Sequence, residues 1–537
     1  MPEYLAPGVY VEEISTGSKP IEGVSTSVAG FLGRTERGPM DVRYVTSWLG
    51  YQRLYGGHLG VDDSFMSYAV QGFFDNGGQR CFVGRVFKSN TGWAQKKLTD
   101  QMTLQAIGKG TWGNRVFFKI LPATKAKGAQ DGEKAKSWIR LRVFYFSGTV
   151  PAGETPIDPD NRELLLDRKR RQPDVIEDYD NVSLDPVSAN YLPTAVNGGS
   201  QLVRLVVTGT PTSAPTADGA LTALGGGDAN ELRPDLEDYK GDLKPHDDLF
   251  PELFGQGRGL KAMESVDQVS LLLAPDQAHP AVTFGEDIAS ALVTSCSQLK
   301  DRFVILSAEQ KFFKTVETGQ ARPTFDTTYG AFYYPWIKIY DPYTRDDVLI
   351  PPSGHVAGIM ARTDIEQGVH KAPANAIVIG AKGLQLPITK EDQALLNPAG
   401  INCIRDFRGD GRGIRLWGAR TMTSDPEWKY INVRRLFLFI EESIDEGTQW
   451  VVFEPNAPST WSRVQQTVSN FLTTVWRNGA LVGGTRDEAF FVKCDRTTMT
   501  QDDIDNGRLI CYIGVAPVKP AEFVIFRIGQ KTADAPA

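Results

Sequence analysis

The sequence of 537 residues is poor in cysteine, and its cysteines lack the spacing that cysteine-based sites require. They are odd in number and far apart, with no CxxC pair, so we expect neither a disulfide framework nor a zinc ribbon. A reducing compartment is the simplest setting for such a chain. The five cysteines are Cys81, Cys296, Cys403, Cys494 and Cys511.

Long apolar runs, a signal peptide pattern and a strong charge are also missing. The apolar run from Leu436 to Ile440 is far shorter than the ~18 residues of a membrane-spanning helix. The first residues carry acidic side chains where a signal peptide needs basic ones. The net charge is −7, without a long basic block, so direct contact with nucleic acid is not expected. We predict a protein that is assembled in the cytoplasm and does not insert into a membrane.

Patterns that support catalysis or hold a cofactor are absent too. The sequence has no phosphate-binding loop, no dinucleotide fingerprint, no HExxH and no GxSxG. Gly409, Gly411 and Gly413 alternate, but no helix follows them, so they predict a solvated turn before the strand at Leu416. The histidines, His355 among them, show no metal-ligand spacing. We predict no catalytic residue, no cofactor and no metal, and therefore a structural protein rather than an enzyme.

What the sequence does contain is the alternation of strands and helices that is typical of an α/β protein. This pattern begins near Thr26, stops near residue 90 and returns after Met263, so we predict an α/β core formed by residues 26–90 and 257–385. The expected elements are strands at 26–33, 81–84, 269–274, 303–306 and 336–340 and helices at 64–74 and 285–299.

The rest of the chain predicts two further domains. Residues 91–256 place strand-like runs among long polar loops, which indicates an inserted, mostly β domain. Residues 386–515 predict a C-terminal domain with a mixed sheet and two long helices. The first helix is expected from Pro426 to Gly447, and an apolar stripe predicts the second from Trp461 to Trp476. Strands are expected at 489–494, 509–515 and 523–528, with a short helix at 500–507.

Each end of the chain carries a short predicted strand that a linker with Pro or Gly residues separates from the rest of the protein. These arms are residues 1–25 and 516–537. Unpaired strand edges recruit other chains, so we predict that each arm adds to the C-terminal sheet of another copy. Head-to-tail contacts that do not close would produce a tube or fibre. The predicted arm residues are Val9, Tyr10, Val11, Ile14, Phe523, Val524, Ile525, Phe526 and Ile528; the acceptor residues are Phe490, Phe491, Val492, Leu509, Ile510, Tyr512 and Ile513; and the hinge residues are Gly17, Pro20, Gly23, Pro517 and Pro520.

Several stretches resemble one known family, the contractile tail sheath proteins of myophages and related injection systems. PPSGHVAGIMARTD from Pro351 is similar to the family's most recognisable core stretch, and the sequence from Gly413 to Thr500 is similar to its C-terminal region. APGVYVEEI from Ala6 looks like its N-terminal arm. GTWGNR from Gly110 and NGGSQLVRL from Asn197 resemble its outer domain, more loosely.

The resemblance implies a helical sheath around an inner tail tube, which contracts without nucleotide hydrolysis and drives the tube through a target envelope. It implies that the insertion faces outwards and that a helix of the C-terminal domain contacts the tube; the candidates are Arg463, Gln466, Asn470 and Arg477. The implied partners are further copies of the chain, the inner tube protein, and baseplate and tail terminator proteins, and the implied location is the virion tail. A tailocin, a non-phage injection particle and a particle-associated hydrolase are the alternatives.

Overall fold

The structure is a computed structural model that describes residues 20–88, 91–125, 138–148, 158–161, 172–209, 211, 213–227, 233–243, 257–313, 323–342 and 344–526. The chain divides into two compact units. We call Thr26–Ile365 with Pro373–Ile431 the core unit, and Met1–Ser25, Glu366–Ala372 and Asn432–Ala537 the C-terminal unit.

The core unit is built on a nine-stranded sheet with the order β16-β19-β18-β13-β12-β11-β1-β3-β2. The central strands from β18 to β3 run parallel, and β2, β19 and β16 pair antiparallel at the two edges. The strands are β1 (Ala29–Gly33), β2 (Arg43–Val45), β3 (Cys81–Arg85), β11 (Leu271–Leu273), β12 (Phe303–Ser307), β13 (Gly330–Tyr334), β16 (Ala376–Ile377), β18 (Ile401–Asp406) and β19 (Ile414–Leu416).

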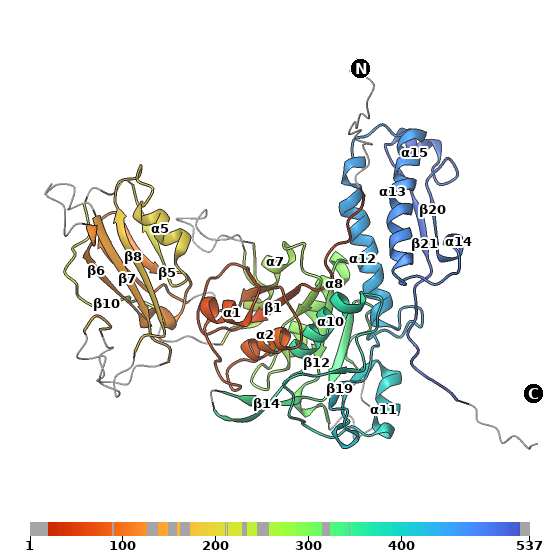
Figure 1. Ribbon diagram of the computed structural model, residues 1–537, viewed down its shortest axis with the longest axis horizontal. Coiled ribbons are helices and arrows are strands. Elements are labelled where there is room, and N and C mark those ends of the chain that lie inside the picture. The colour runs from red at the N-terminus through yellow and green to blue at the C-terminus, as the bar shows by residue number, and fades with distance from the viewer. Residues whose placement is uncertain are drawn as a thin grey trace, which may run out of the picture. The chain divides into compact units, whose positions relative to one another are not determined.

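Helices cover both faces of this sheet, because its central strands are apolar on both sides (Figure 1). On β1, Leu32 points toward the face of α8, whereas the ring of Phe31 packs edge-on against Phe73 of α2. The helices of the core unit are α1 (Trp48–Tyr55), α2 (Met66–Asp75), α6 (Leu236–Lys240), α7 (Gly259–Glu264), α8 (Gly285–Leu299), α10 (Ser353–Gln367) and α11 (Lys390–Leu396). A small sheet joins β14 (Ile337–Asp341) to β15 (Asp346–Ile350) and β17 (Gly383–Leu384).

Two glycines let α10 pack closely on α2. A Cβ atom at Gly354 would lie 2.3 Å from the carbonyl oxygen of Ala69, and one at Gly358 would lie 2.4 Å from that of Phe73. No other residue fits at either position without moving a backbone. The stretch from Pro351 that resembles the sheath family is therefore a helix buried against its neighbour.

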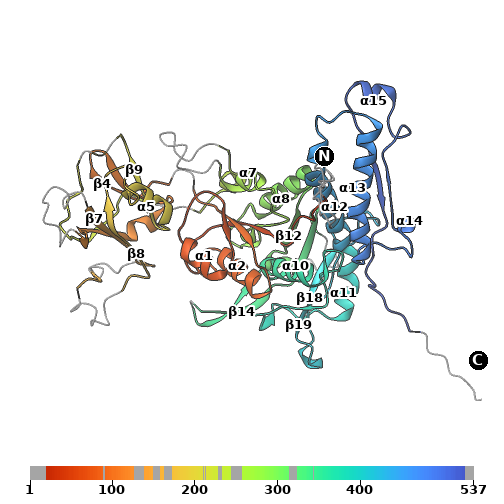
Figure 2. The ribbon, with the colours of Figure 1, turned by 45° about the horizontal axis from the view of Figure 1, so that its top comes forward.

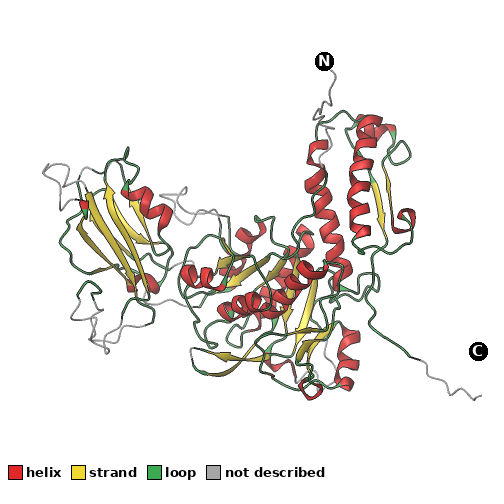
Figure 3. Cartoon of the chain, viewed as in Figure 1, coloured by secondary structure: helices red, strands yellow, loops and turns green. Residues whose placement is uncertain are grey.

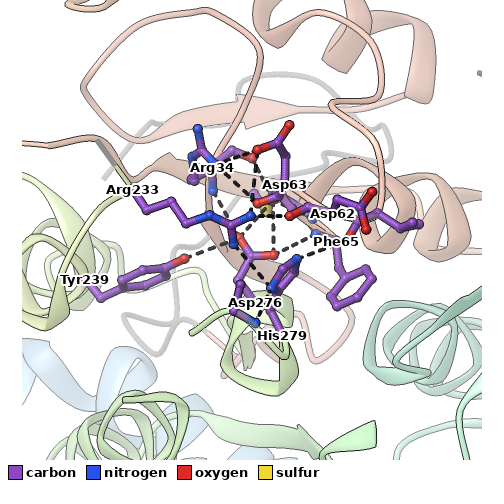
Figure 4. Close-up of polar contacts among 12 residues, drawn as sticks. Arg34, Asp62, Asp63, Phe65, Arg233, Tyr239, Asp276 and His279 are labelled. Atoms are coloured by element: carbon purple, nitrogen blue, oxygen red, sulfur yellow. Dashed lines mark hydrogen bonds and ion pairs between the residues drawn. The ribbon is translucent and has the colours of Figure 1, made fainter. Parts of the chain in front are cut away.

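A buried carboxylate fills the position where open α/β sheets bind ligands. Such ligands lie at the carboxyl ends of the strands where the strand order reverses, which in this sheet is between β1 and β11. Asp276, in the short helix η3 (Pro275–Ala278) after β11, lies there (Figure 4). Its carboxylate accepts hydrogen bonds from Ser64 Oγ at 2.8 Å, from the Phe65 N–H at 2.6 Å and from the Tyr239 hydroxyl at 3.2 Å. The chain's own groups thus occupy this crevice.

The described residues of the insertion form two antiparallel sheets on one shared apolar core (Figure 3). One sheet has the order β10-β6-β7-β8 and the other β4-β5-β9. The elements are β4 (Gln95–Thr99), β5 (Met102–Ala106), β6 (Val116–Pro122), β7 (Trp138–Tyr145), β8 (Val175–Ser183), α5 (Leu192–Gly199), β9 (Val203–Val207) and β10 (Thr222–Ala223). The predicted fold class, a multidomain α/β protein with a mostly β insertion, is confirmed.

The C-terminal unit combines two long helices with a two-stranded sheet (Figure 2). Its elements are α12 (Ile431–Thr448), α13 (Pro458–Arg477), α14 (Arg486–Ala489), β20 (Phe490–Lys493), α15 (Gln501–Asp505) and β21 (Tyr512–Val515). The predicted end of α13 at Asn478-Gly479 is confirmed, because Asn478 caps the helix and Gly479 takes the positive φ of 79°. The capping box that Thr500 and Asp503 predict at α15 is also present.

Some predicted limits differ from the structure. The first long helix begins at Ile431 and not at Pro426, because Thr423 and Ser424 bind Asp326 and Arg420 forms a β-bridge with Tyr430. Strand β21 starts at Tyr512 rather than Leu509. Strands β18 and β19 pair in the core sheet, so we propose that the core continues to Ile431, past the boundary expected at residue 385. The other domain limits stay predictions.

The contacts of Asp276 predict a large stability effect. Replacing Asp276 by Ala leaves three buried donors without their acceptor, so the free energy of unfolding should fall by on the order of 3 kcal/mol. Asp63 is the matched control, since its side chain is 52% exposed and forms surface ion pairs with Arg34 and Arg233. Asp63→Ala should change the free energy of unfolding by less than about 1 kcal/mol. Urea unfolding measures both, and equal effects would contradict the assigned role of Asp276.

Candidate assembly surface

The candidate assembly surface is the sheet β20-β21 together with helix α13, on which the sheet packs. The apolar stripe of α13 is buried as predicted. Trp461, Val464, Val468 and Leu472 lie in one cluster with Leu436 and Ile440 of α12. Pro458 suits the first turn of α13, where the missing N–H has no helical partner. In Figures 1 and 2, α12 and α13 run side by side, and the sheet β20-β21 lies on the other side of α13.

The two strands pair antiparallel, with Phe490 opposite Val515 and Lys493 opposite Tyr512. Their side chains alternate between a buried and a solvent-facing side. Phe490, Val492 and Val515 belong to the helix-facing apolar cluster, whereas Phe491 and Tyr512 are 59% and 57% exposed. The Phe491 ring lies across Gly514, where a Cβ would come within 2.2 Å of it. The sheet therefore presents aromatic rings on its outer face.

Backbone pairing shows which groups point away from the ladder. The Ala516 N–H donates to the Ala489 carbonyl, so Phe490–Val515 is a non-hydrogen-bonded pair. It follows that the N–H and C=O groups of Ile513 and Val515 point to the outer edge of β21, and those of Phe490 and Val492 to the outer edge of β20.

The two edges differ in how far the chain satisfies them. On β20, the Phe490 N–H donates to the Arg486 carbonyl and the Val492 carbonyl accepts from Gln465 at 3.0 Å. On β21, the outward groups of Ile513 and Val515 have no hydrogen-bond partner among the described residues. Pro517, two residues on, has no N–H to offer and so ends this row of donors. The open edge is therefore the outer edge of β21.

Both linkers are anchored to the C-terminal unit over part of their length. Ile21 packs on Gly447 of α12, the Val24 N–H donates to Ser443 Oγ at 3.1 Å, and Gly23 packs against Phe439. At the other end, the Val482 N–H donates to the Ala516 carbonyl, and Pro517 forms a β-bridge with Leu481. Gly23 and Pro517 are thus packed or paired, and the C-terminal linker is paired at least as far as Val518, whose N–H donates to the Ala480 carbonyl.

Beyond Val518 the chain leaves the sheet without regular structure. The side chains of Phe523, Val524, Ile525 and Phe526 are 71%, 68%, 78% and 84% exposed. These four consecutive large apolar residues form an exposed apolar segment. Pro520 is half-buried and Pro20 exposed.

The tube-contact candidates lie on the polar side of α13. Gln466, Asn470 and Arg477 are exposed, whereas Arg463 is held by the Trp450 ring at 4.3 Å and by Glu454 at 3.5 Å. The predicted acceptor residues lie in or next to the β20-β21 ladder. Two of them, Leu509 and Ile510, precede it, and the others are within it: Phe490, Phe491, Val492, Tyr512 and Ile513. Val9, Tyr10, Val11, Ile14, Gly17 and Ile528 lie outside the described residues.

Sequence reasoning missed three features of this surface. Gln465 caps the edge of β20, Gly514 makes room for Phe491, and Pro517 ends the open edge. The Gly-Val-Ala-Pro run was a usable signal, because a proline soon after a strand suggests an edge whose donors stop there.

The residues that the sequence offered as candidates for catalysis or metal binding lie in the packed core or in a turn. His355 is buried in α10, its ring lies against Gly72, and burial lowers its pKa to about 4. Gly409 to Gly413 form the predicted turn before β19. Within the described ranges, no three His, Cys, Asp or Glu residues are placed to hold a metal ion. In the same part of the chain, no helix is both long and apolar enough to cross a membrane.

These features define a structural α/β protein whose C-terminal sheet keeps one strand edge open. Residues 258–422 match the phage tail sheath protein central domain, and residues 423–531 match the phage tail sheath C-terminal domain. Together the two matches cover about half of the chain. The chain belongs to the contractile tail sheath protein family. The predicted structural, non-enzymatic role is confirmed by this relationship.

Individual relatives agree. The tail sheath protein of Vibrio phage KVP40 is 28% identical over 213 residues, which are 39% of this chain and 31% of the phage protein. That of Enterobacteria phage T4 is 24% identical over 441 residues, 78% of this chain and 63% of the phage protein. The matched regions of the first curated relatives span only 31%, 49% and 33% of the relatives' own length.

Solved structures extend the similarity to nearly the whole chain. A chain of the anti-feeding prophage baseplate is 25% identical, with a TM-score of 0.55, and the match covers 98% of this chain and 99% of that one. A sheath chain of the PVC extracellular contractile injection system in the contracted state shares the fold, with a TM-score of 0.56, 23% identity and 99% coverage of both chains.

The burial of His355 predicts acid sensitivity. Its pKa is lowered from 6.5 to about 4 in the folded protein, so the unfolded chain binds more protons between these values. Stability is therefore retained above pH 6.5 and lost as the pH falls toward 4, by about 3 kcal/mol in total. In His355→Gln this part of the pH dependence should disappear, whereas His370→Gln, at a half-buried position, should keep it. Urea unfolding between pH 7 and 4 measures the difference; identical pH profiles of His355→Gln and the wild type would refute the prediction.

Proposed function

We propose that this chain is the subunit of a helical, contractile sheath that polymerises around an inner tail tube. The observation that carries the proposal is the open edge of β21 beside an exposed apolar C-terminal segment. An edge that accepts a strand and a segment that can donate one are complementary halves of β-augmentation. Since both belong to one chain, each copy can pair with further copies, and contacts of this kind that do not close on themselves build a helix.

The free energies expected for strand addition favour a stable contact between copies. Each backbone hydrogen bond in an added strand contributes ~0.5–1.5 kcal/mol. Burying an apolar side chain such as Phe523 or Ile525 adds about 1.5–3 kcal/mol as an upper estimate. Even after the entropy cost of association, several such contacts in every copy would hold a polymer together.

Anchoring of the linkers supports a sheath that can change its shape without losing its connections. The N-terminal linker is fixed on α12 from Ile21, and the C-terminal one is paired as far as Val518. Any pivot therefore lies before Ile21 or after Val518, with Gly17, Pro20 and Pro520 as the remaining hinge candidates. Bodies that move as rigid units between such pivots can pass from an extended to a contracted lattice.

Contraction would be driven by energy stored in the assembly, without nucleotide hydrolysis. An assembled state separated from a more stable one by a kinetic barrier releases its energy when it is triggered. The side chain of Asp276 and its partners fill the crevice where an α/β sheet would otherwise bind a ligand such as a nucleotide, which favours this source of energy.

Within the sheath, we assign the polar side of α13 to the inner tube, through Gln466, Asn470 and Arg477 with Arg463 beside them. The insertion is assigned to the outer surface. The other partners are baseplate and tail terminator proteins, and the particle is assembled in the host cytoplasm as part of a virion tail.

A phage-like extracellular injection particle is the second candidate. It is favoured by the match to the anti-feeding prophage chain, which is 25% identical over 98% of this chain. The sheath subunit would act in the same way in both kinds of particle.

Removal of the N-terminal arm tests the proposal. Purified full-length protein should form hollow tubes in negative-stain electron microscopy, alone or with an inner tube protein. The variant lacking residues 1–14 should remain folded and soluble but form no long tubes, because the N-terminal arm that each copy is proposed to add to a neighbour is gone. The anchored part of the linker, from Ile21, stays in place in this variant. Tubes of normal length from the truncated chain would refute strand exchange through the N-terminal arm.

Paired substitutions test the two halves of the contact. Ile513→Pro removes an outward N–H from the edge of β21, and Ile525→Pro removes one from the exposed segment. Both should shorten tubes or prevent them. Ile513→Val and Ile525→Val are the matched controls, since they keep the N–H and an apolar, β-branched side chain, and they should still polymerise. Circular dichroism checks the fold, and sedimentation measures the polymer. Equal polymer yields from the Pro and Val variants would exclude backbone pairing at these residues.

A further inference from the structure

Two cysteines lie opposite each other at the end of the two-stranded sheet. Cys494 directly follows β20, and Cys511 directly precedes β21. Lys493 is paired with Tyr512, so continuing the register by one residue brings Cys494 opposite Cys511. Because Phe490–Val515 is a non-hydrogen-bonded pair and the type alternates, Cys494–Cys511 is also a non-hydrogen-bonded position.

That position suits a disulfide bond. In non-hydrogen-bonded pairs the Cα atoms lie ~4.5 Å apart, within the range of about 4.4–6.8 Å that disulfides require. Both residues face the helix-side apolar cluster of the C-terminal unit, and their thiols are close enough for each to shift the pKa of the other. The two sulfurs therefore already face each other in the reduced protein.

Each member of the pair differs from the other three cysteines in one respect, Cys511 in access and Cys494 in acidity. Cys511 is half-buried, whereas Cys81, Cys296 and Cys403 are fully buried. Burial raises the pKa of Cys403 to about 12 and also raises that of Cys81 and Cys296. The interaction between the two thiols instead lowers the pKa of Cys494 and raises that of Cys511, so access rather than acidity makes Cys511 the thiol that reacts first.

We propose that Cys494 and Cys511 form a reversible intrachain disulfide when the protein meets a low-molecular-weight disulfide such as oxidised glutathione. This goes beyond the sequence-based expectation of five free thiols, because a sheet register cannot be read from cysteine spacing alone. The bond would close the segment between the two strands, which contains α15, and fix the end of the sheet that carries the open edge.

The chemistry is thiol–disulfide exchange in two steps. The sulfur of the half-buried Cys511 attacks oxidised glutathione, forms a mixed disulfide and releases one glutathione thiolate. The Cys494 thiolate then attacks the Cys511 sulfur and releases the second glutathione. In total, two protein thiols lose two protons and two electrons, and one oxidised glutathione becomes two reduced glutathione molecules.

The consequence for assembly rests on the proposed function. A disulfide at this position would hold the ends of β20 and β21 together and so resist loss of the strand-accepting edge under load. The disulfide itself is measured on the unassembled full-length chain, so failure of the sheath proposal and failure of this one are distinguishable.

The test exposes the reduced, full-length protein to glutathione buffers of increasing oxidised fraction, followed by acid quenching and alkylation. We expect two of the five thiols to be lost, and peptide mass spectrometry should find Cys494 linked to Cys511 within one chain. The unfolding midpoint should be higher in the oxidised than in the reduced protein. Five free thiols throughout, links to other cysteines, or disulfide-linked dimers would overturn the proposal.

Two serine variants complete the design. Cys494→Ser should stop the reaction at the mixed disulfide, so that one glutathione stays on Cys511 and the oxidation-dependent rise of the unfolding midpoint is lost. Cys403→Ser is the matched control at a buried cysteine outside the pair, and it should form the same disulfide as the wild type. If neither the wild type nor Cys403→Ser forms the intrachain bond, the proposal is wrong.

Discussion

A strand paired on one side only leaves half of its backbone donors and acceptors without a ladder partner, and this constraint acts on β21. Two-stranded sheets are marginal by themselves, so the C-terminal unit supports this one by packing α13 against one face. The same unit satisfies one donor and one acceptor on the outer edge of β20, through Arg486 and Gln465, but leaves Ile513 and Val515 open. The asymmetry leaves the edge of β21 as the proposed acceptor.

The cost of an open edge is unwanted association, and the chain limits it in two ways. The edge is short, and Pro517 removes the next outward donor. Register on the remaining donors is set by the alternation of buried and exposed side chains around Phe491 and Gly514. These restrictions favour a specific partner strand over general aggregation.

The local features of the C-terminal unit were predictable from sequence, whereas the features that depend on distant residues were not. Helix α13 follows from its apolar spacing and its Asn478-Gly479 end, and α15 from its capping box. The start of α12 was misplaced because Asp326, far away in the sequence, binds Thr423 and Ser424. The limits of β21 and the role of Gln465 likewise depend on how β20 and α13 are placed. The predicted arms are only partly within the described residues, so their pairing remains a proposal.

Contacts between residues that are distant in the sequence also explain how an α/β core can be purely structural. A strand order that reverses between β1 and β11 is the arrangement that creates ligand sites in other α/β proteins. Here Asp276 draws Ser64, Phe65 and Tyr239 into that position, and 212 residues of sequence separate Asp276 from Ser64. A crevice closed in this way ties strand β11 to the start of α2 and to the segment returning from the insertion. The core thereby gains rigidity at the point where an enzyme of this fold would need an opening. This rigidity suits the proposed sheath, in which rigid bodies joined by exchanged strands would move without unfolding.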